Sequence, residues 1–340
     1  MARYNLLPII TLMIFSYIPS WGQTKSVTYE ELYDEPYEIN KLFMKLQPVI
    51  AEVGSANMYV GFGLEAEYYH ESLLNIKADF RRAYGGPFDL MQNLSARNNI
   101  QQVNGISTST HSSMAGEIIG TYHIKDWEKD TETKMILYRS SYRRGNKWKS
   151  KVPDHIKVPS KVRKIYGARL GPYFQSGGID VGTAMRKQGI ESINVLREGV
   201  DAQPLSSDST MYTNQSAFGF AVGGSLTWIK NFAIKPTRTY SSTASDMIIS
   251  VYADMLITPW TNIENLSYDG NEYDLSPIKH NKFGFRLGAD GKFNREFGWG
   301  YGIEIGMRPQ VSKQMFYTAV KLSIPIFSTN LNHEVEAFSK

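Results

Sequence analysis

Two glutamates, Glu65 and Glu67, are the most direct candidates for chemistry in this sequence. They lie two residues apart in the segment MYVGFGLEAEYY. Residues i and i+2 of a β-strand share one face, so the two carboxylates could act together as a general acid and base. Lys77 and Arg81 in the following segment could instead neutralise them as ion pairs. We favour the ion-pair interpretation.

A hydrolase site would need a hydroxyl nucleophile beside a histidine. His123 lies in the segment GTYHIKD, and His111 lies beside Ser109, Ser112 and Ser113. Serines of this kind are common in any exposed loop, and no G-x-S-x-G motif is present. The sequence therefore predicts that the protein is not an enzyme. A lipid-modifying hydrolase that acts at a membrane rim is kept as an alternative.

The glycine-rich stretch FGWGYGIEIGMRP, residues 297–309, raises the question of a phosphate-binding loop. A dinucleotide fingerprint needs G-x-G-x-x-G, but isoleucine occupies the third glycine position in both possible registers. The six histidines form no H-E-x-x-H motif, and the sequence has no cysteine. The oxygen-rich segment YDGNEYD departs from EF-hand spacing. We therefore predict no cofactor and no metal site.

One segment, residues 143–164, carries a dense run of basic residues. It could contact a polyanion such as the phosphates of lipopolysaccharide. The residues assigned to this contact are Arg143, Arg144, Lys147, Lys149 and Lys151. The alternative is that the segment is a solvated loop. The sequence does not indicate on which side of the membrane this segment lies. The whole chain has a net charge of only +4, which argues against a nucleic-acid partner.

The elements that must position these side chains alternate with period two. In residues 297–309, aromatic and aliphatic residues take one parity, while glycine, Glu304 and Arg308 take the other. The same pattern recurs in 58–69, 74–82, 165–175, 218–228, 247–257, 283–290 and 316–326, and more weakly in 43–53, 116–125 and 133–143. Small residues mixed with charges of both signs on the polar face suit the interior of a β-barrel. The predicted lumen residues are Glu65, Glu67, Lys77, Asp79, Arg81, Arg169, Asp254, Arg286, Asp290, Glu304, Arg308 and Lys321.

The apolar parity carries no charge in its best strands, and it is aromatic near the strand ends. Trp228, Trp260, Phe297 and Trp299 are therefore predicted to lie at the membrane interfaces. We expect an all-β, transmembrane, antiparallel up-and-down barrel of about twelve strands, with ten as the alternative. The count of twelve requires an extra strand between 144 and 161. Short turns at 70–72, 126–132, 230–244 and 293–296 would face the periplasm, and the loops 84–115, 176–215 and 260–279 the outside.

The ends of the chain suggest secretion. Residues 1–22 have a basic start at Arg3, an apolar run from Leu6 to Ile18 and small residues before Gln23, as in a secretory signal peptide. Residues 23–42 are predicted to be a periplasmic segment without strand alternation, 43–327 the barrel and 328–340 a periplasmic tail. The segment TAMRKQGIESINVLREG could form one amphipathic helix over the barrel mouth.

With its signal peptide, its glycine- and aromatic-rich strands and the final strand MFYTAVKLSIPIF, the chain resembles outer-membrane β-barrel proteins of Gram-negative, Bacteroidota-like bacteria. The resemblance implies location in the cell outer membrane and contact with its lipid and lipopolysaccharide. It implies a structural or interaction role in an outer-membrane assembly, with other outer-membrane or periplasmic proteins as partners, or a narrow passive pore. A soluble secreted β-protein is the remaining alternative. The thirteen residues after Phe327 depart from barrels that stop at a terminal aromatic.

Overall fold

The computed structural model describes residues 28–70, 72–101, 109–136, 141–150, 155–197, 204–237, 242–268, 271–294 and 298–329. The predicted signal peptide, Phe297, Lys151 and nearly all of the predicted tail lie outside these ranges.

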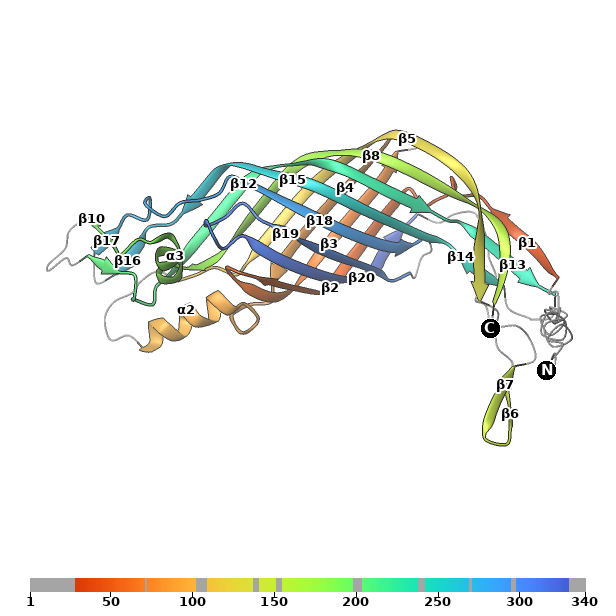
Figure 1. The fold of residues 1–340 in the computed structure, drawn as a ribbon, viewed down its shortest axis with the longest axis horizontal. Helices are drawn as coiled ribbons and strands as arrows, with labels where there is room; N and C mark the ends of the chain where they lie inside the picture. Colours follow the sequence, from red (N-terminus) through yellow and green to blue (C-terminus); the bar gives the residue numbers. More distant parts are fainter. Residues whose placement is uncertain are drawn as a thin grey trace, which may run out of the picture.

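Ten antiparallel strands form a closed barrel (Figure 1). Each strand pairs with its neighbour in the chain, and the last pairs with the first, which is an up-and-down topology. The strands are β2 (Leu42–Gly54), β3 (Met58–His70), β4 (Leu74–Ala83), β5 (Met114–Ile136), β8 (His155–Asp180), β12 (Tyr212–Ile229), β15 (Met247–Ile263), β18 (Phe283–Phe293), β19 (Gly300–Met307) and β20 (Phe316–Ser328). The prediction of an all-β antiparallel barrel is confirmed.

The prediction of twelve strands is wrong, and the alternative of ten is correct. The weak segment 116–125 and the first four residues of the weak segment 133–143 lie in one long strand, β5, and the predicted turn 126–132 lies inside it. The extra strand expected between 144 and 161 does not exist as a barrel strand, because β8 begins at His155 and continues to Asp180. Beyond Lys125, β5 pairs only with β8, so this part of the hairpin projects past the barrel.

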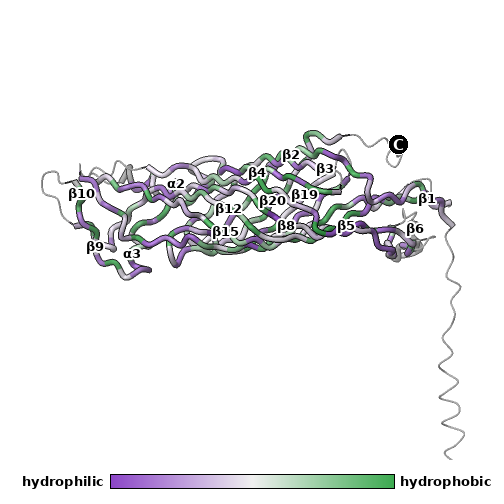
Figure 2. Tube along the Cα trace, turned by 90° about the horizontal axis from the view of Figure 1, so that it is seen from above, coloured by the Kyte–Doolittle hydropathy of each residue, from purple (hydrophilic) through white to green (hydrophobic). Residues whose placement is uncertain are grey.

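Alternating side chains divide the barrel into an apolar outer face and a polar inner face. Along β19, buried and exposed residues alternate without a break, and the exposed ones are Tyr301, Ile303, Ile305 and Met307. Leu64, Leu170, Met255, Leu287 and Leu322 on other strands are also exposed, each at a position where the barrel faces outward. Figure 2 shows hydrophobic and hydrophilic residues interleaved along the strands. The arrangement is the reverse of a soluble protein with an apolar core.

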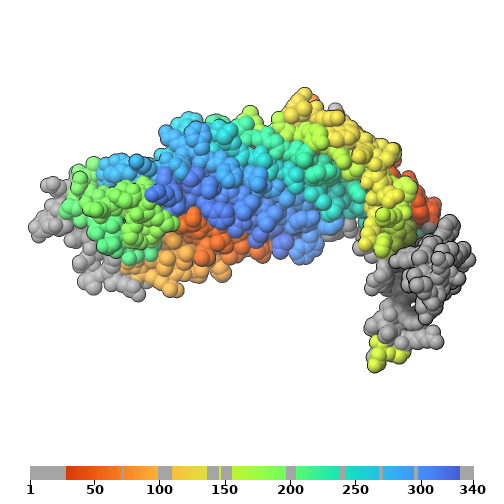
Figure 3. Space-filling view, viewed as in Figure 1, coloured from red at the N-terminus to blue at the C-terminus, as the bar shows by residue number. Residues whose placement is uncertain are grey.

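The long connections form a cap at one end of the barrel, which we call the loop end. It contains η1 (Gly86–Phe88), α2 (Leu90–Gln101), α3 (Val181–Gln188), β9 (Ser192–Ile193), β10 (Val195–Arg197), β11 (Leu205–Ser206), β16 (Leu266–Tyr268) and β17 (Asn271–Tyr273). Twelve buried residues, among them Val181, Met185, Leu266, Ile278 and Val311, form its core. Figure 3 shows the segments around α3 (green) and β17 (light blue) massed at this end. None of the helices in the described ranges is long and apolar enough to cross a membrane.

The helix expected within 183–199 is shorter than predicted. α3 ends at Gln188 because Gly189 adopts a left-handed conformation with φ 75° and caps the helix. Asp180 caps the other end, and its carboxylate accepts a hydrogen bond from the Thr183 N–H (2.9 Å). The rest of the segment forms the short strands β9 and β10.

The opposite end of the barrel, the terminal end, carries a small second layer that we call the annex. β1 (Tyr29–Asp34), β13 (Phe232–Pro236) and β14 (Thr243–Ser245) form a sheet. This sheet packs against the projecting β5–β8 hairpin through Met135, Val158, Phe232 and Ile234. The predicted periplasmic segment 23–42 therefore contains a strand. This strand does not alternate between buried and exposed residues, because the first four residues of β1 are all exposed. The predicted turn 230–244 contains β13 and part of β14.

Gly171 on β8 tests how closely the strands approach. A Cβ at this position would lie 1.8 Å from the carbonyl oxygen of Ile118 on β5, which is a backbone atom that cannot move aside. We expect Gly171→Ala to lower the free energy of unfolding by about 1–3 kcal/mol through overpacking. Tryptophan fluorescence during denaturant unfolding in detergent measures the change.

Gly224→Ala is the matched control, because its new Cβ would meet only the carbonyl oxygen of Gly167 at 3.6 Å. Equal stability of the two variants would contradict this packing of β5 against β8.

Candidate functional site: the closed barrel interior

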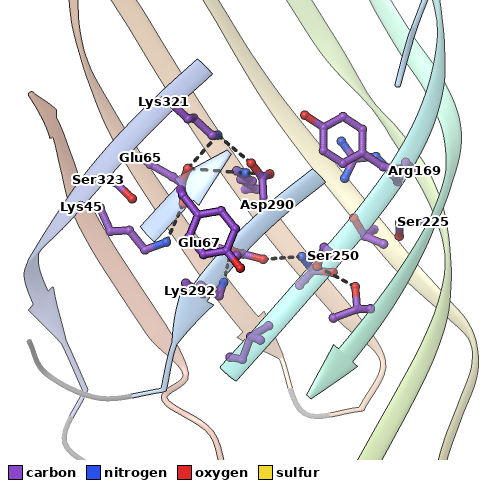
Figure 4. Close-up of a pocket in the computed structure, with 18 residues that line it drawn as sticks. Lys45, Glu65, Glu67, Arg169, Ser225, Ser250, Asp290, Lys292, Lys321 and Ser323 are labelled. Atoms are coloured by element: carbon purple, nitrogen blue, oxygen red, sulfur yellow. Dashed lines mark hydrogen bonds and ion pairs between the residues drawn. The ribbon is translucent and has the colours of Figure 1, made fainter. Parts of the chain in front are cut away.

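The barrel interior near the terminal end holds four lysines and four acids, which we call the lysine layer: Lys45, Lys77, Lys292 and Lys321 with Glu65, Glu67, Asp79 and Asp290. Glu65 is the centre, with its carboxylate 3.0 Å from Lys45 Nζ, 3.5 Å from Lys77 Nζ and 3.1 Å from Lys321 Nζ. Lys292 pairs with Glu67, and Lys77 pairs with Asp290. Figure 4 shows these groups converging from β2, β3, β18 and β20.

A second set lies closer to the loop end, and we call it the arginine layer: Arg81, Arg169, Arg286 and Arg308 with Glu52, Glu117, Asp254 and Glu304. Arg286 is the centre and is fully buried. Its guanidinium lies 2.5 Å from Glu117 and 2.8 Å from Asp254. Tyr317 donates a hydrogen bond to Glu304 (2.5 Å).

Aromatic rings supply further partners for these cations. The guanidinium of Arg169 lies 4.2 Å from the ring centroid of Tyr252, and that of Arg308 lies 3.8 Å from Tyr317. Lys292 Nζ lies 4.4 Å from the ring of Phe43. Such cation–π contacts strengthen where water is excluded.

Apolar side chains complete the packing of the interior. Toward the terminal end lie Ile39, Phe43, Tyr69, Ile165, Ile229 and Ile248, and a second apolar cluster of Ile119, Tyr173, Ala221 and Leu256 lies beside the arginine layer, where Tyr173 pairs with Glu117. A cavity of about 30 Å³ borders the lysine layer, and one of about 10 Å³ lies between the layers. These volumes hold one or two water molecules each at most. The interior is packed with side chains.

The N-terminal approach to β2 crosses the terminal end and completes this packing. Asn231 Nδ2 donates to the carbonyl oxygens of Glu35 (3.2 Å) and Glu38 (2.8 Å). The Asn40 N–H donates to Asn294 Oδ1 (2.8 Å). These bonds hold residues 35–40 across the barrel and place Ile39 in the apolar cluster toward the terminal end.

The structure places all twelve predicted lumen residues on the inner side of the barrel wall. Ten are buried, while Asp290 and Lys321 are partly exposed to the cavity of the lysine layer. All twelve take part in ion pairs: six belong to the lysine layer and six to the arginine layer. Glu65 and Glu67, proposed as a possible acid–base pair, each contact lysines.

Sequence reasoning missed Lys45, Glu52, Glu117 and Lys292. Lys45 and Glu52 fall on opposite parities of β2, because a bulge between Gln47 and Ile50, beside Pro48, shifts the register. Glu117 lies on β5, whose alternation is broken by a second bulge between His123 and Lys125. Lys292 shares the parity of Asp290 and could have been found by extending that segment by two residues.

The two histidines considered for a hydrolase lie far apart, because His111 precedes β5 and His123 lies near the middle of that strand. Twelve residues separate them, about 40 Å along an extended strand. The His123 ring contacts the carbonyl oxygen of Ser72 (3.0 Å) and Asn75 Oδ1 (3.3 Å). Ser112 and Ser113 near His111 bond to Gln92 and Asn57. These contacts bring no hydroxyl nucleophile to His123.

Among the described residues, no group of three or more histidines and acids is arranged to hold a metal ion. In the oxygen-rich loop, the Asp274 carboxylate accepts hydrogen bonds from the Ser276 N–H (2.9 Å) and hydroxyl (2.7 Å). These bonds lower the pKa of Asp274, since they stabilise its charged form. The geometry is that of a local turn.

The basic run lies at the terminal end. Arg143 and Arg144 end β6 (Ser141–Arg144), and Lys147 and Lys149 belong to β7 (Lys147–Ser150). These two strands form a hairpin beyond the end of the β5–β8 pair (Figure 1). Its backbone therefore lies on the same side of the barrel as the start of β2 and the end of β20.

The predicted interface tryptophans divide between the two ends. Trp228 pairs with Lys164 near the terminal end of β12, and Trp299 precedes β19 at the same end. Trp260 pairs with Phe218 toward the loop end, and the two rings are in tilted contact with centroids 5.6 Å apart. Trp260 and Trp299 are exposed.

At the junction between barrel and annex, Asp126 accepts a bidentate hydrogen bond from Arg163, and the Arg163 guanidinium stacks 4.5 Å from the Tyr37 ring. Nearby, the Asp34 carboxylate accepts hydrogen bonds from the Lys161 N–H (2.9 Å and 3.1 Å). Burial raises the pKa of Asp34 above its ordinary value and outweighs this bond. Burial likewise lowers the pKa of Lys230. The annex is thus a folded part of the protein.

No family model matches the chain, and no curated protein matches it.

Arg286 tests the charge pairing of the interior. Replacing it with Met removes the ion-pair partner of Glu117 and one partner each of Asp254 and Glu304, while keeping an unbranched side chain in the same space. We expect a loss of about 3–5 kcal/mol in the free energy of unfolding, because a buried charge is left without compensation. Denaturant unfolding in detergent measures it.

Lys157→Met is the control, because the Lys157–Glu132 pair (3.6 Å) is 70% and 66% exposed. An exposed pair of this kind contributes about 0–1 kcal/mol. If both variants lose the same small amount, the arginine layer does not stabilise the fold.

Proposed function

We propose that this protein is an integral outer-membrane β-barrel with a structural or interaction role in an outer-membrane assembly. The observation that carries the proposal is the inverted barrel wall, apolar outside and charged inside. Monomeric soluble proteins rarely expose contiguous apolar patches larger than a few hundred square ångströms. Here the exposed apolar side chains run around the whole barrel, from Met58 on β3 to Leu322 on β20. A bilayer would cover this surface.

The closed barrel also meets the backbone requirement of a membrane. Every strand has a partner on both edges, so no edge is left open in the ring. Unpaired N–H and C=O groups cannot be tolerated in hydrocarbon, and only helices and closed barrels avoid them. The charged part of the β5–β8 hairpin and the polar cap lie beyond the ends of this wall, where water would surround them.

The interior favours a scaffold over a narrow passive pore. Two charge layers and two apolar clusters fill the lumen, and the two cavities that border the layers hold only a few water molecules. An ion crossing this path would have to break several buried ion pairs. The contacts of His123 and His111 lend no support to a lipid hydrolase at the rim.

The folded structures at both ends supply surfaces for partners. If the terminal end faces the periplasm, the annex and the basic hairpin would face periplasmic proteins, and the cap would face the outside. Lipid and lipopolysaccharide would contact the wall. The predicted signal peptide agrees with this localisation, and the basic hairpin then faces away from lipopolysaccharide in the outer leaflet.

Membrane insertion can be tested with one outward residue of the wall. Ile303 lies in the middle of β19 and is 53% exposed. In a bilayer, Ile303→Arg should cost about 2–4 kcal/mol and lower the yield of folding into phospholipid vesicles. The measurement is denaturant unfolding of the vesicle-inserted protein.

Leu196→Arg is the matched control, since Leu196 is 57% exposed on β10 of the cap, outside the wall. It should change stability by less than about 0.5 kcal/mol. A soluble secreted protein would tolerate both substitutions equally, and carbonate would extract it from membranes without detergent.

Planar-bilayer recording separates the scaffold from the pore. We expect the refolded protein to produce no conductance steps, because the paired side chains of the two charge layers reach across the lumen and fill it. Reproducible single-channel steps from protein whose barrel is verified to be folded would reject the scaffold role in favour of a pore.

A further inference from the structure

The outer wall of the barrel contains an apolar groove of about 490 Å³. Its floor is formed by Ala66 on β3 and Ala78 on β4, which pair directly in the sheet. Larger outward residues border it, including Met44, Leu64, Phe80 and Ile118. Two small residues side by side thus leave a depression in a wall that otherwise carries large side chains.

The rim of the groove is held in place by packing. On β8, the ring of Phe174 lies over Gly116, where an added Cβ would be 2.3 Å from the ring. Phe174 also lies beside Phe80, with ring centroids 6.4 Å apart. The absence of a side chain at Gly116 therefore lets Phe174 lie close to the wall, which keeps the groove open.

The width of the groove limits what can fill it. The next outward residues on the two floor strands are Leu64 and Phe80 on one side and Tyr68 and Ile76 on the other, all exposed. Positions four residues apart on one strand, such as Leu64 and Tyr68, lie about 13 Å apart along the backbone. Their side chains narrow the space between them. A helix with side chains is about 10–12 Å wide and does not fit. A single hydrocarbon chain does.

We propose that this groove binds one acyl chain of a phospholipid in the leaflet nearer the terminal end. The proposal rests on the membrane insertion proposed above. Ala66 lies four residues from the terminal end of β3 and eight from its other end, and Met44 is the third residue of β2. The floor is therefore nearer the terminal end, which is the periplasmic side in the proposed orientation.

Packing, and not the hydrophobic effect, would hold the chain. The surrounding lipid tails are as apolar as the groove, so moving a chain between them gains little from exclusion of water. The gain comes from dispersion contacts that a fixed, shaped surface makes along the length of the chain. Filling the floor removes these contacts without changing the polarity of the wall.

The test uses the full-length protein in vesicles of phosphatidylethanolamine and phosphatidylglycerol, extracted gently into detergent. Native mass spectrometry then measures how much phospholipid each barrel retains. We expect the native protein to retain one phospholipid and Ala78→Phe to lower the retained fraction by about threefold or more. Ala168→Phe is the control, since Ala168 is exposed and faces outward on β8 but does not line the groove.

Gly116→Ala provides a second variant, in case the larger substitution impairs folding. The new methyl group would push the ring of Phe174 away from the wall toward the groove, so retention should again fall. Heat-modifiable mobility on gels shows that each variant is folded. Unchanged retention in both folded groove variants overturns the proposal. When lipopolysaccharide is offered together with the phospholipids, retention of lipopolysaccharide alone also overturns it.

Different results would reject membrane insertion and the acyl-chain site. If carbonate releases the native protein from the vesicles, membrane insertion itself is rejected, and the acyl-chain site with it. If the protein stays inserted and the groove variants retain phospholipid as the native protein does, only the acyl-chain site is rejected.

Discussion

Each charged side chain inside this barrel must lie against an opposite charge, because an uncompensated ion in a water-poor interior costs several kilocalories per mole. The two layers satisfy this condition with equal numbers of cations and carboxylates, four of each in the lysine layer and four of each in the arginine layer. The partners come from strands far apart in the sequence, such as Glu65 on β3 and Lys321 on β20. The ion pairs therefore depend on closure of the barrel, and they bind its opposite walls together.

This constraint explains several other features. Glycines and small residues on the inner face leave room for long side chains, as at Gly302, where an added Cβ would meet both Asp290 and Lys321. Tyrosines such as Tyr252 and Tyr317 fill the space between the charges and bond to Glu304. The apolar clusters beside the layers exclude water from them, which strengthens the ion pairs. A filled interior of this kind suits a stable scaffold whose working surfaces lie at its ends.

The sequence predicted the class of fold because one periodicity dominates it. In β19, and in β18 as far as Asp290, apolar residues alternate with glycine or charged residues, so Glu304, Arg286 and Asp290 could be assigned to the inner face. It failed where a bulge changes the parity, as between Gln47 and Ile50, and Glu52 was missed for that reason. It also failed where a strand leaves the barrel. The residues from Lys125 onward in β5 are mostly polar because they lie beyond the barrel wall, and a polar run looks like a turn in the sequence.

By itself, then, the sequence determined that the chain forms an antiparallel barrel and which residues of its regular strands face inward. Side-chain direction alternates along any strand, so these properties are local. The tertiary structure decided the number of strands, the partners of each charge and the presence of the annex. Ring closure between β20 and β2 sets which residues meet across the lumen. Packing of Phe232 and Ile234 against Met135 and Val158 couples segments about a hundred residues apart, and no local pattern records it.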